Sequence, residues 1–202
     1  MLNNLLIKSE VIIAIVIAVV VVLLLIAAVA LVAWWISTWN AIVKLDNKAV
    51  EAWATIDVYL KKRYDLVPNL VETVKGYAKH ESETLQKVIA ARNAAGAAVT
   101  PEEKMKAAQA MNSSLKVLLN AVAESYPDLK ASANFNDLQT QLKVLEDDLE
   151  AARRYYNGVV KAFNTKIELF PSSIVANKKG CVKKTYFELE SAVERQNVKV
   201  SF

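Results

Sequence analysis

The side chains that could do chemistry are few, and a histidine segment is the first of two places where they gather. His80 lies between Lys79 and Glu81, with Glu83 close by. A histidine next to carboxylates can act as a general base, but that role needs a nucleophile and an orienting partner, and the sequence marks neither. We predict a surface or helix-packing role for His80, and a small enzyme using His80 and Glu81 remains a competing hypothesis.

The second place is Cys181, which has lysines at positions 178, 179, 183 and 184 around it. Nearby cations can lower the pKa of a thiol and make it reactive, but an ordinary thiol in a flexible tail is the favoured interpretation. A single cysteine excludes an internal disulfide, and a single histidine excludes a histidine-rich metal site. No phosphate-binding glycine loop or nucleophile elbow occurs. We predict no catalytic residue, no cofactor and no metal site.

The charge and composition limit both the partners and the fold of the protein. The formal net charge of the 202 residues is +4, which argues against a strongly electrostatic nucleic-acid binder and is compatible with an anionic membrane surface. Only four glycines and four prolines occur, and the part beyond residue 38 is rich in Ala, Leu, Lys, Glu and Gln, which favour helices. We expect an all-α fold without a nucleic-acid partner.

The stretch from Val11 to Ile36, centred near Leu24, contains no charge, no glycine and no proline. A bilayer core is about 30 Å thick, so roughly 20 apolar residues in an α-helix suffice to cross it. The alternatives are a buried core helix, which is rarely apolar over such a length, and a cleaved signal peptide. Signal peptides have a shorter apolar region of about 7–15 residues. We predict a permanent membrane anchor.

Three of the four tryptophans follow at the end of this stretch, at Trp34, Trp35 and Trp39. Indole rings favour the lipid headgroup level, where one edge is wet and the other is apolar. Trp34 and Trp35 also occupy the place where a signal peptide would be cleaved. The tryptophans therefore support a retained anchor with its interface near residues 34–39.

Four amphipathic helices are predicted beyond the anchor, and the first two meet at a proline. The first helix ends near residues 64–67, because the residue before Pro68 is pushed out of the α region. The second runs from Pro68 to about Ala95, with Gly76 packed closely against another backbone, and Asn93–Thr100 forms a loop. Their candidate core residues are Ile42, Leu45, Ala49, Trp53, Ile56 and Leu60, then Leu70, Val74, Tyr77, Leu85, Val88 and Ile89.

The last two helices have clearer boundaries. Thr100–Glu103 has the pattern of a capping box with proline at the first helical position, and the third helix stops at Tyr126–Pro127. The fourth, capped by Ser132 or Asn134, carries a long heptad-like seam and ends at Pro171. The candidate core residues are Met105, Ala108, Met111, Leu115, Leu118, Val122 and Tyr126, then Leu138, Leu142, Leu145, Leu149, Ala152, Tyr156, Val159, Phe163, Ile167 and Phe170.

The predicted architecture is an N-terminal transmembrane helix that continues into an antiparallel bundle of about four long helices, followed by an irregular tail. We divide the chain into an anchor segment, 1–38, a helical bundle, 39–171, and a basic and aromatic tail, 172–202. The lysines of the tail face either lipid or solvent, and solvent is favoured. The cluster Lys61–Arg63 is expected to be a solvated face or a partner contact.

The stretch from Arg63 to Glu81 resembles the signature of the LemA family. The residues that carry the resemblance are Arg63, Tyr64, Asp65, Pro68, Asn69, Gly76, His80 and Glu81. Supporting pieces follow in order at Tyr126–Lys130, Arg154–Asn157, Phe170–Ser172 and Tyr186–Glu188. The resemblance implies a bacterial membrane-anchored helical bundle, with interaction candidates in the signature and no catalytic site. Relatives are associated with membrane and envelope functions, and some are encoded beside a membrane metalloprotease.

These observations favour a non-enzymatic scaffold in the bacterial inner membrane that binds the lipid bilayer and self-associates as a homo-oligomer. The alternative is an adaptor or regulator of a membrane protease or envelope enzyme. Lys44 and Lys48 follow the anchor whereas Lys8 alone precedes it, so the positive-inside rule favours a cytoplasmic domain. Many members of the family have a lysine-rich start that would favour the opposite, extracytoplasmic side.

Overall fold

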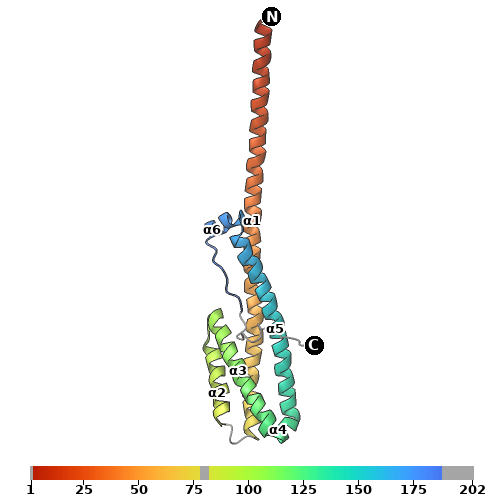
Figure 1. Cartoon of the computed structure of the whole chain (residues 1–202), viewed down its shortest axis with the longest axis vertical. Coiled ribbons are helices and arrows are strands. Elements are labelled where there is room, and N and C mark those ends of the chain that lie inside the picture. Colours follow the sequence, from red (N-terminus) through yellow and green to blue (C-terminus); the bar gives the residue numbers. More distant parts are fainter. Residues whose placement is uncertain (1, 78–81, 188–202) are drawn as a thin grey trace, which may run out of the picture. The chain divides into compact units, whose positions relative to one another are not determined.

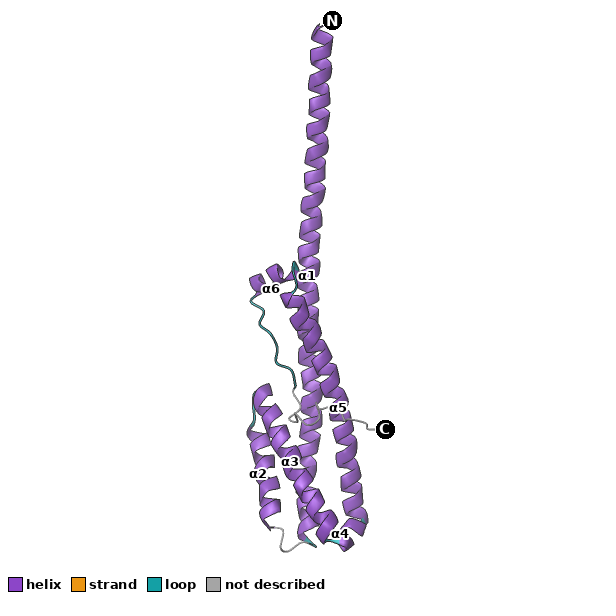
Figure 2. Cartoon of the chain, viewed as in Figure 1, coloured by secondary structure: helices purple, strands orange, loops and turns teal. Residues whose placement is uncertain are grey.

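The computed structural model of the 202-residue chain describes residues 2–77 and 82–187, and the side chains of residues 12–77 and 83–187. The predicted all-α fold is confirmed, because the described residues form helices and no strand (Figures 1 and 2). The helices are α1 (Leu2–Lys75), α2 (Ser82–Ala97), α3 (Pro101–Ser125), α4 (Pro127–Ala131), α5 (Ala133–Glu168) and α6 (Ser172–Lys179).

The chain forms two compact units, which are described separately. The anchor unit comprises residues 1–47 and 161–184, and the bundle unit comprises residues 48–160 and 185–202. The helices α1 and α5 each contribute to both units. In the anchor unit, α1 is long and apolar enough to cross a membrane, as predicted.

The predicted helix break at Pro68 is wrong, because α1 continues through this residue. A proline inside a helix removes one backbone hydrogen bond and costs about 3 kcal/mol. However, Val67, Leu70 and Val74 around it are buried, and burial of each such side chain gains about 1.5–3 kcal/mol. Tertiary packing therefore outweighs the local penalty, and the helix ends just before Gly76.

Two predictions about glycines also fail. Among the described residues, a Cβ at Gly76 would meet only carbonyl oxygens of α1, the nearest being that of Thr73 at 3.5 Å, and no backbone of another described element packs there. The predicted loop Asn93–Thr100 is shorter, because α2 continues through Gly96. One glycine costs a helix only about 1 kcal/mol, and the burial of Ala95 favours continuation.

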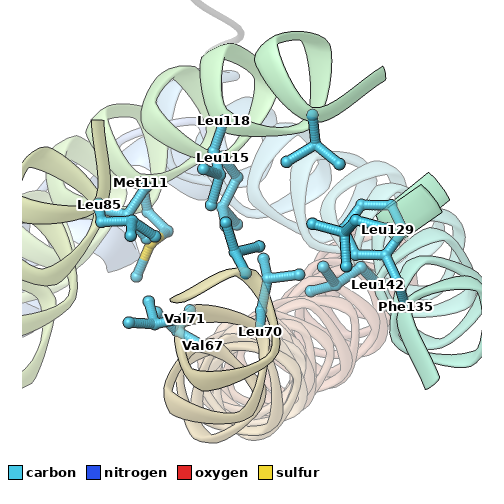
Figure 3. Close-up of a cluster of buried hydrophobic side chains, with 13 residues drawn as sticks. Val67, Leu70, Val71, Leu85, Met111, Leu115, Leu118, Leu129, Phe135 and Leu142 are labelled. Atoms are coloured by element: carbon cyan, nitrogen blue, oxygen red, sulfur yellow. The ribbon is translucent and has the colours of Figure 1, made fainter. Parts of the chain in front are cut away.

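The core of the bundle unit is assembled from α1 to α5. Figure 3 shows side chains from these helices pointing toward one another around Leu70, Leu115 and Leu142. The predicted core positions of α3 from Met105 to Val122 are all buried. Tyr77 was predicted to lie in the core, but it is exposed because α1 has already ended.

The boundaries of α3 are as predicted. The Thr100 Oγ1 accepts from the Glu103 N–H at 3.2 Å, and a Glu103 carboxylate oxygen accepts from the Thr100 N–H at 3.0 Å, which completes the capping box. The α3 helix ends at Ser125, before Pro127. The short helix α4 that follows was not predicted.

The seam of α5 is buried along most of its length, but its predicted last member is not. Phe170 is 81% exposed, because α5 ends at Glu168 and the chain turns into α6. The helix α6 replaces the irregular start that was expected for the tail. In the anchor unit, α1, α5 and α6 share a buried cluster of Ile42, Phe163, Ile167, Val175 and Ala176.

Candidate functional site

Two buried arginines and one partly buried carboxylate form a charged cluster in the bundle unit, which we call the triad. The Arg63 Nη1 donates to the Glu146 Oε2 at 2.6 Å, and its Nη2 donates to the Asn112 Oδ1 at 2.8 Å. The Arg153 Nη1 lies 3.8 Å from the other Glu146 oxygen. Arg63 and Arg153 are only 5% and 8% exposed. The triad thus joins α1 to α5, and the hydrogen bond to Asn112 joins it to α3.

The triad is short of negative charge. Two guanidinium groups share the carboxylate of Glu146, and within the described part of the chain the Nε atoms of both arginines and the Tyr64 hydroxyl have no hydrogen-bond partner. Burial lowers the pKa of Arg153, which Glu146 partly offsets, and burial raises the pKa of Tyr64. Buried charge is stable only when paired, so the triad favours a further anionic group.

A groove opens beside the triad, between α3 and α5. We call it the α3–α5 groove, and its volume is about 610 Å³. Its lining includes three cations, one carboxylate, several amides and three leucines. These residues are Arg63, Asn112, Leu115, Lys116, Leu119, Asn120, Asn136, Gln139, Thr140, Leu142, Lys143 and Glu146. Amides and cations above an apolar floor suit a polypeptide segment with acidic side chains.

The end of the described chain is held on α5 by an asparagine. The Asn157 Nδ2 donates to the Phe187 carbonyl at 2.9 Å, and its Oδ1 accepts from the Phe187 N–H at 2.8 Å. The Phe187 ring stacks on Trp53 and lies 4.5 Å from the Arg153 guanidinium. We call residues 181–187 the strap. In the anchor unit, Asn164 holds Lys184 of the strap through the same pair of bonds, both 2.9 Å.

A second, smaller pocket of about 430 Å³ lies elsewhere in the bundle unit. Asp65 and Tyr64 contribute to its lining, as do Arg92 and the ion pair between Lys104 and Asp57, whose atoms are 2.6 Å apart. No group of histidine, cysteine, aspartate or glutamate that could hold a metal occurs among the described residues.

The predicted anchor residues fall into two groups. Leu24, Ile36 and Trp34 are exposed on α1, whereas the side chain of Val11 lies outside the described ones. Trp35 and Trp39 are partly buried against the cluster of the anchor unit, and the Lys179 ammonium lies 5.9 Å from the Trp39 ring. The tryptophans therefore connect the apolar stretch to α6.

The signature residues do not converge on one site. Arg63 and Tyr64 belong to the triad region and Asp65 to the second pocket, while Pro68, Asn69 and Gly76 are exposed on or just after α1. His80 and Glu81 lie outside the described residues, and nothing tests their predicted role. The cluster Lys61–Arg63 was expected to be a solvated face or a partner contact, and for Arg63 the solvated face is wrong because its guanidinium is buried between helices.

Residue patterns alone did not reveal the partners of Arg63. Glu146, Arg153 and Asn112 have the types and spacing of an ordinary solvated helix face, and only the burial of Arg153 and the bonds of Glu146 and Asn112 to Arg63 distinguish them. Asn157 and Phe187 occur in the pieces that resemble the LemA family. A further signal in the sequence is the aromatic Phe187 directly before Glu188 and Glu190. Such a residue suits a buried contact at the end of the strap.

Comparison with known proteins supports the resemblance seen in the sequence. The model of the LemA family matches residues 52–202. The chain is also 28% identical over 162 residues to Protein LemA of Metamycoplasma hominis, and the alignment covers 80% of this chain and 74% of that protein.

Proposed function

This chain belongs to the LemA family, and on that premise we propose that it is a non-enzymatic scaffold that is anchored in a bacterial inner membrane and self-associates there. The observation that carries the anchoring is the exposure of α1, in which every residue from Ile12 to Trp34 is exposed. Such an apolar surface greatly exceeds the patches that soluble monomers expose. A bilayer covers it without any further protein.

A corner of the anchor unit supports contact with the lipid headgroups. Leu169, Phe170 and Ile174 are exposed where α5 turns into α6, and Lys178 and Lys179 end α6. This corner belongs to the same compact unit as the span, and α6 packs near Trp35 and Trp39. Exposed aromatic and aliphatic side chains with adjacent lysines are typical of segments that lie in a membrane interface.

The orientation that we propose places the bundle unit in the cytoplasm. Lys44 and Lys48 follow the apolar stretch, and Lys8 precedes it. The positive-inside rule counts such charges close to the span. An extracytoplasmic bundle is the alternative, and labelling of Lys48→Cys in intact cells with an impermeant thiol reagent distinguishes the two.

An exposed face of α5 supports self-association. Val144, Ala151, Tyr155 and Gly158 are exposed and follow one another at seven-, four- and three-residue steps, so they share one side of the helix. Apart from its chain neighbours and the adjacent backbone of α5, no atom of the described chain lies within 4 Å of a Cβ placed on Gly158. A helical glycine without a close neighbour in its own chain suits the close approach of a second copy.

The test measures the mass of the full chain in nanodiscs. We expect a uniform oligomer for the native chain and monomers for Gly158→Leu, because the new side chain would separate the two helices. Gly96→Leu is the matched control, since Gly96 is also helical and, apart from the adjacent backbone of α2, no described atom lies within 4 Å of its Cβ position. A native chain that is monomeric in native membranes would refute the scaffold proposal and favour an adaptor of a membrane protease or envelope enzyme.

A further inference from the structure

We propose that the α3–α5 groove is a peptide-binding site whose occupant is the C-terminal tail of the same chain, residues 188–202. The inference does not depend on the scaffold function. The described chain ends at Phe187, whose ring lies 4.5 Å from the Arg153 guanidinium of the triad. Glu146, the partner of Arg153, lines the groove.

The strap shows how α5 binds a chain segment. The amide of Asn157 both donates to and accepts from the backbone of Phe187, so recognition does not depend on the side chain of the bound residue. Residues 181–187 form neither helix nor strand, so the bonds of Asn157 occupy backbone groups of Phe187 that no regular structure uses.

The same side of α5 continues into the groove. Glu146 and Gln139 precede Asn157 by 11 and 18 residues, which are close to whole numbers of turns at 3.6 residues per turn. Both residues line the groove. A strap that continues along this side of α5 beyond Phe187 therefore enters the groove.

The length of the tail is sufficient. Gln139 lies about 27 Å from Asn157 along α5 at 1.5 Å per residue. At about 3.3 Å per extended residue, eight residues beyond Phe187 reach that level. The eighth residue is Arg195, and seven further residues remain for the rest of the groove.

The charges of tail and groove are complementary. The first seven tail residues contain Glu188, Glu190 and Glu194 and no cation. The groove lining carries three cations against the single carboxylate of Glu146, and Arg153, which stacks on Phe187, has an unpartnered Nε. The acidic start of the tail thus supplies the negative charge that the triad lacks.

Cysteine cross-linking in the full chain tests the placement. On a Cys181→Ser background in nanodiscs, Gln139→Cys paired with Arg195→Cys is expected to form an intrachain disulfide in a glutathione buffer. Asp137→Cys paired with Arg195→Cys is the control, because Asp137 lies two residues away on another side of α5 and is exposed. Equal yields for both pairs, or no intrachain disulfide, would overturn the proposal. An interchain disulfide would also overturn it and assign the groove to the tail of a second copy.

A peptide assay tests the same proposal without engineered cysteines. A labelled peptide of residues 188–202 is expected to bind the chain that ends at Phe187, and to bind the full chain about 100-fold more weakly, because a tethered tail competes at roughly millimolar effective concentration. Lys143→Glu in the groove is expected to weaken peptide binding about tenfold, whereas the exposed Lys161→Glu leaves it unchanged. Equal affinity for both chain lengths, or the same affinity for a scrambled peptide, would overturn the proposal.

Discussion

At the scale of single residues, the triad shows how one carboxylate compensates two buried guanidinium groups. Arg63 and Arg153 are buried, whereas Glu146, their shared partner, keeps about a third of its side chain exposed. Removing the partner of a buried ion leaves that ion without compensation, and this costs more than the pair itself contributes. Glu146 therefore has a larger effect on stability than its exposure suggests.

We predict that Glu146→Gln lowers the free energy of unfolding of the bundle by about 3 kcal/mol, at the lower end of the range for broken buried pairs. Urea unfolding of the full chain in detergent, followed by circular dichroism, measures this change. The matched control is Glu150→Gln, which removes an exposed carboxylate that pairs with Arg154 on the same helix. The control should lose less than about 0.5 kcal/mol, and equal losses would contradict a structural role for the triad.

At the scale of elements, local hydrogen bonds determine where α3 begins, whereas tertiary packing determines where α1 ends. The capping box of Thr100 and Glu103 needs only residues three apart. By contrast, α1 passes through Pro68 because Val67, Leu70 and Val74 are buried by other helices. Local chemistry thus predicts a helix end well only where tertiary packing does not oppose it.

We predict that Thr100→Ala lowers the free energy of unfolding by about 1 kcal/mol, as expected for the loss of an N-cap. Glu103→Ala should also destabilise the bundle, in a manner that depends on pH. Backbone N–H groups of Thr100 and Val99 donate to the Glu103 carboxylate and lower its pKa below 4.5. Its contribution is therefore complete above pH 4.5 and is lost as the pH falls through the lowered pKa.

Unfolding measured at several pH values separates these effects. The difference between native chain and Glu103→Ala should shrink steadily in acid. Glu102→Ala serves as control, because it removes a carboxylate from the same turn and leaves the capping box intact. A destabilisation by Glu103→Ala that persists at pH 2 would show that its carboxylate charge is not responsible.

At the scale of the whole molecule, the attachment that we propose uses both the apolar stretch of α1 and the corner between α5 and α6. We predict that a fluorophore on Phe170→Cys, in a Cys181→Ser background, is quenched by brominated lipids in proteoliposomes. Lys161→Cys, an exposed position on α5 in the same unit, should remain unquenched, because nine helical residues correspond to about 13 Å. Equal quenching at both positions, or at neither, would refute an interfacial corner.

The sequence by itself determined the elements whose signals are local or repeat along the chain. The apolar stretch, the helical composition, the capping box and most core positions follow from residue type and from the periodicity of an α-helix. The wrong boundaries at Pro68, Gly96 and Phe170 arose because local propensity was followed where burial decided the outcome, or because an apolar pattern was extended beyond the helix end.

Only the tertiary structure decided which charged residues are functional candidates. Arg63 and Glu146 are 83 residues apart in the chain, and neither differs in type or spacing from a residue on a solvated helix face. The clamp of Asn157 on Phe187 is likewise invisible to periodicity, because it joins a helix to a segment without regular structure. Burial and pairing of this kind depend on which helix faces meet, and that is a property of the packed molecule.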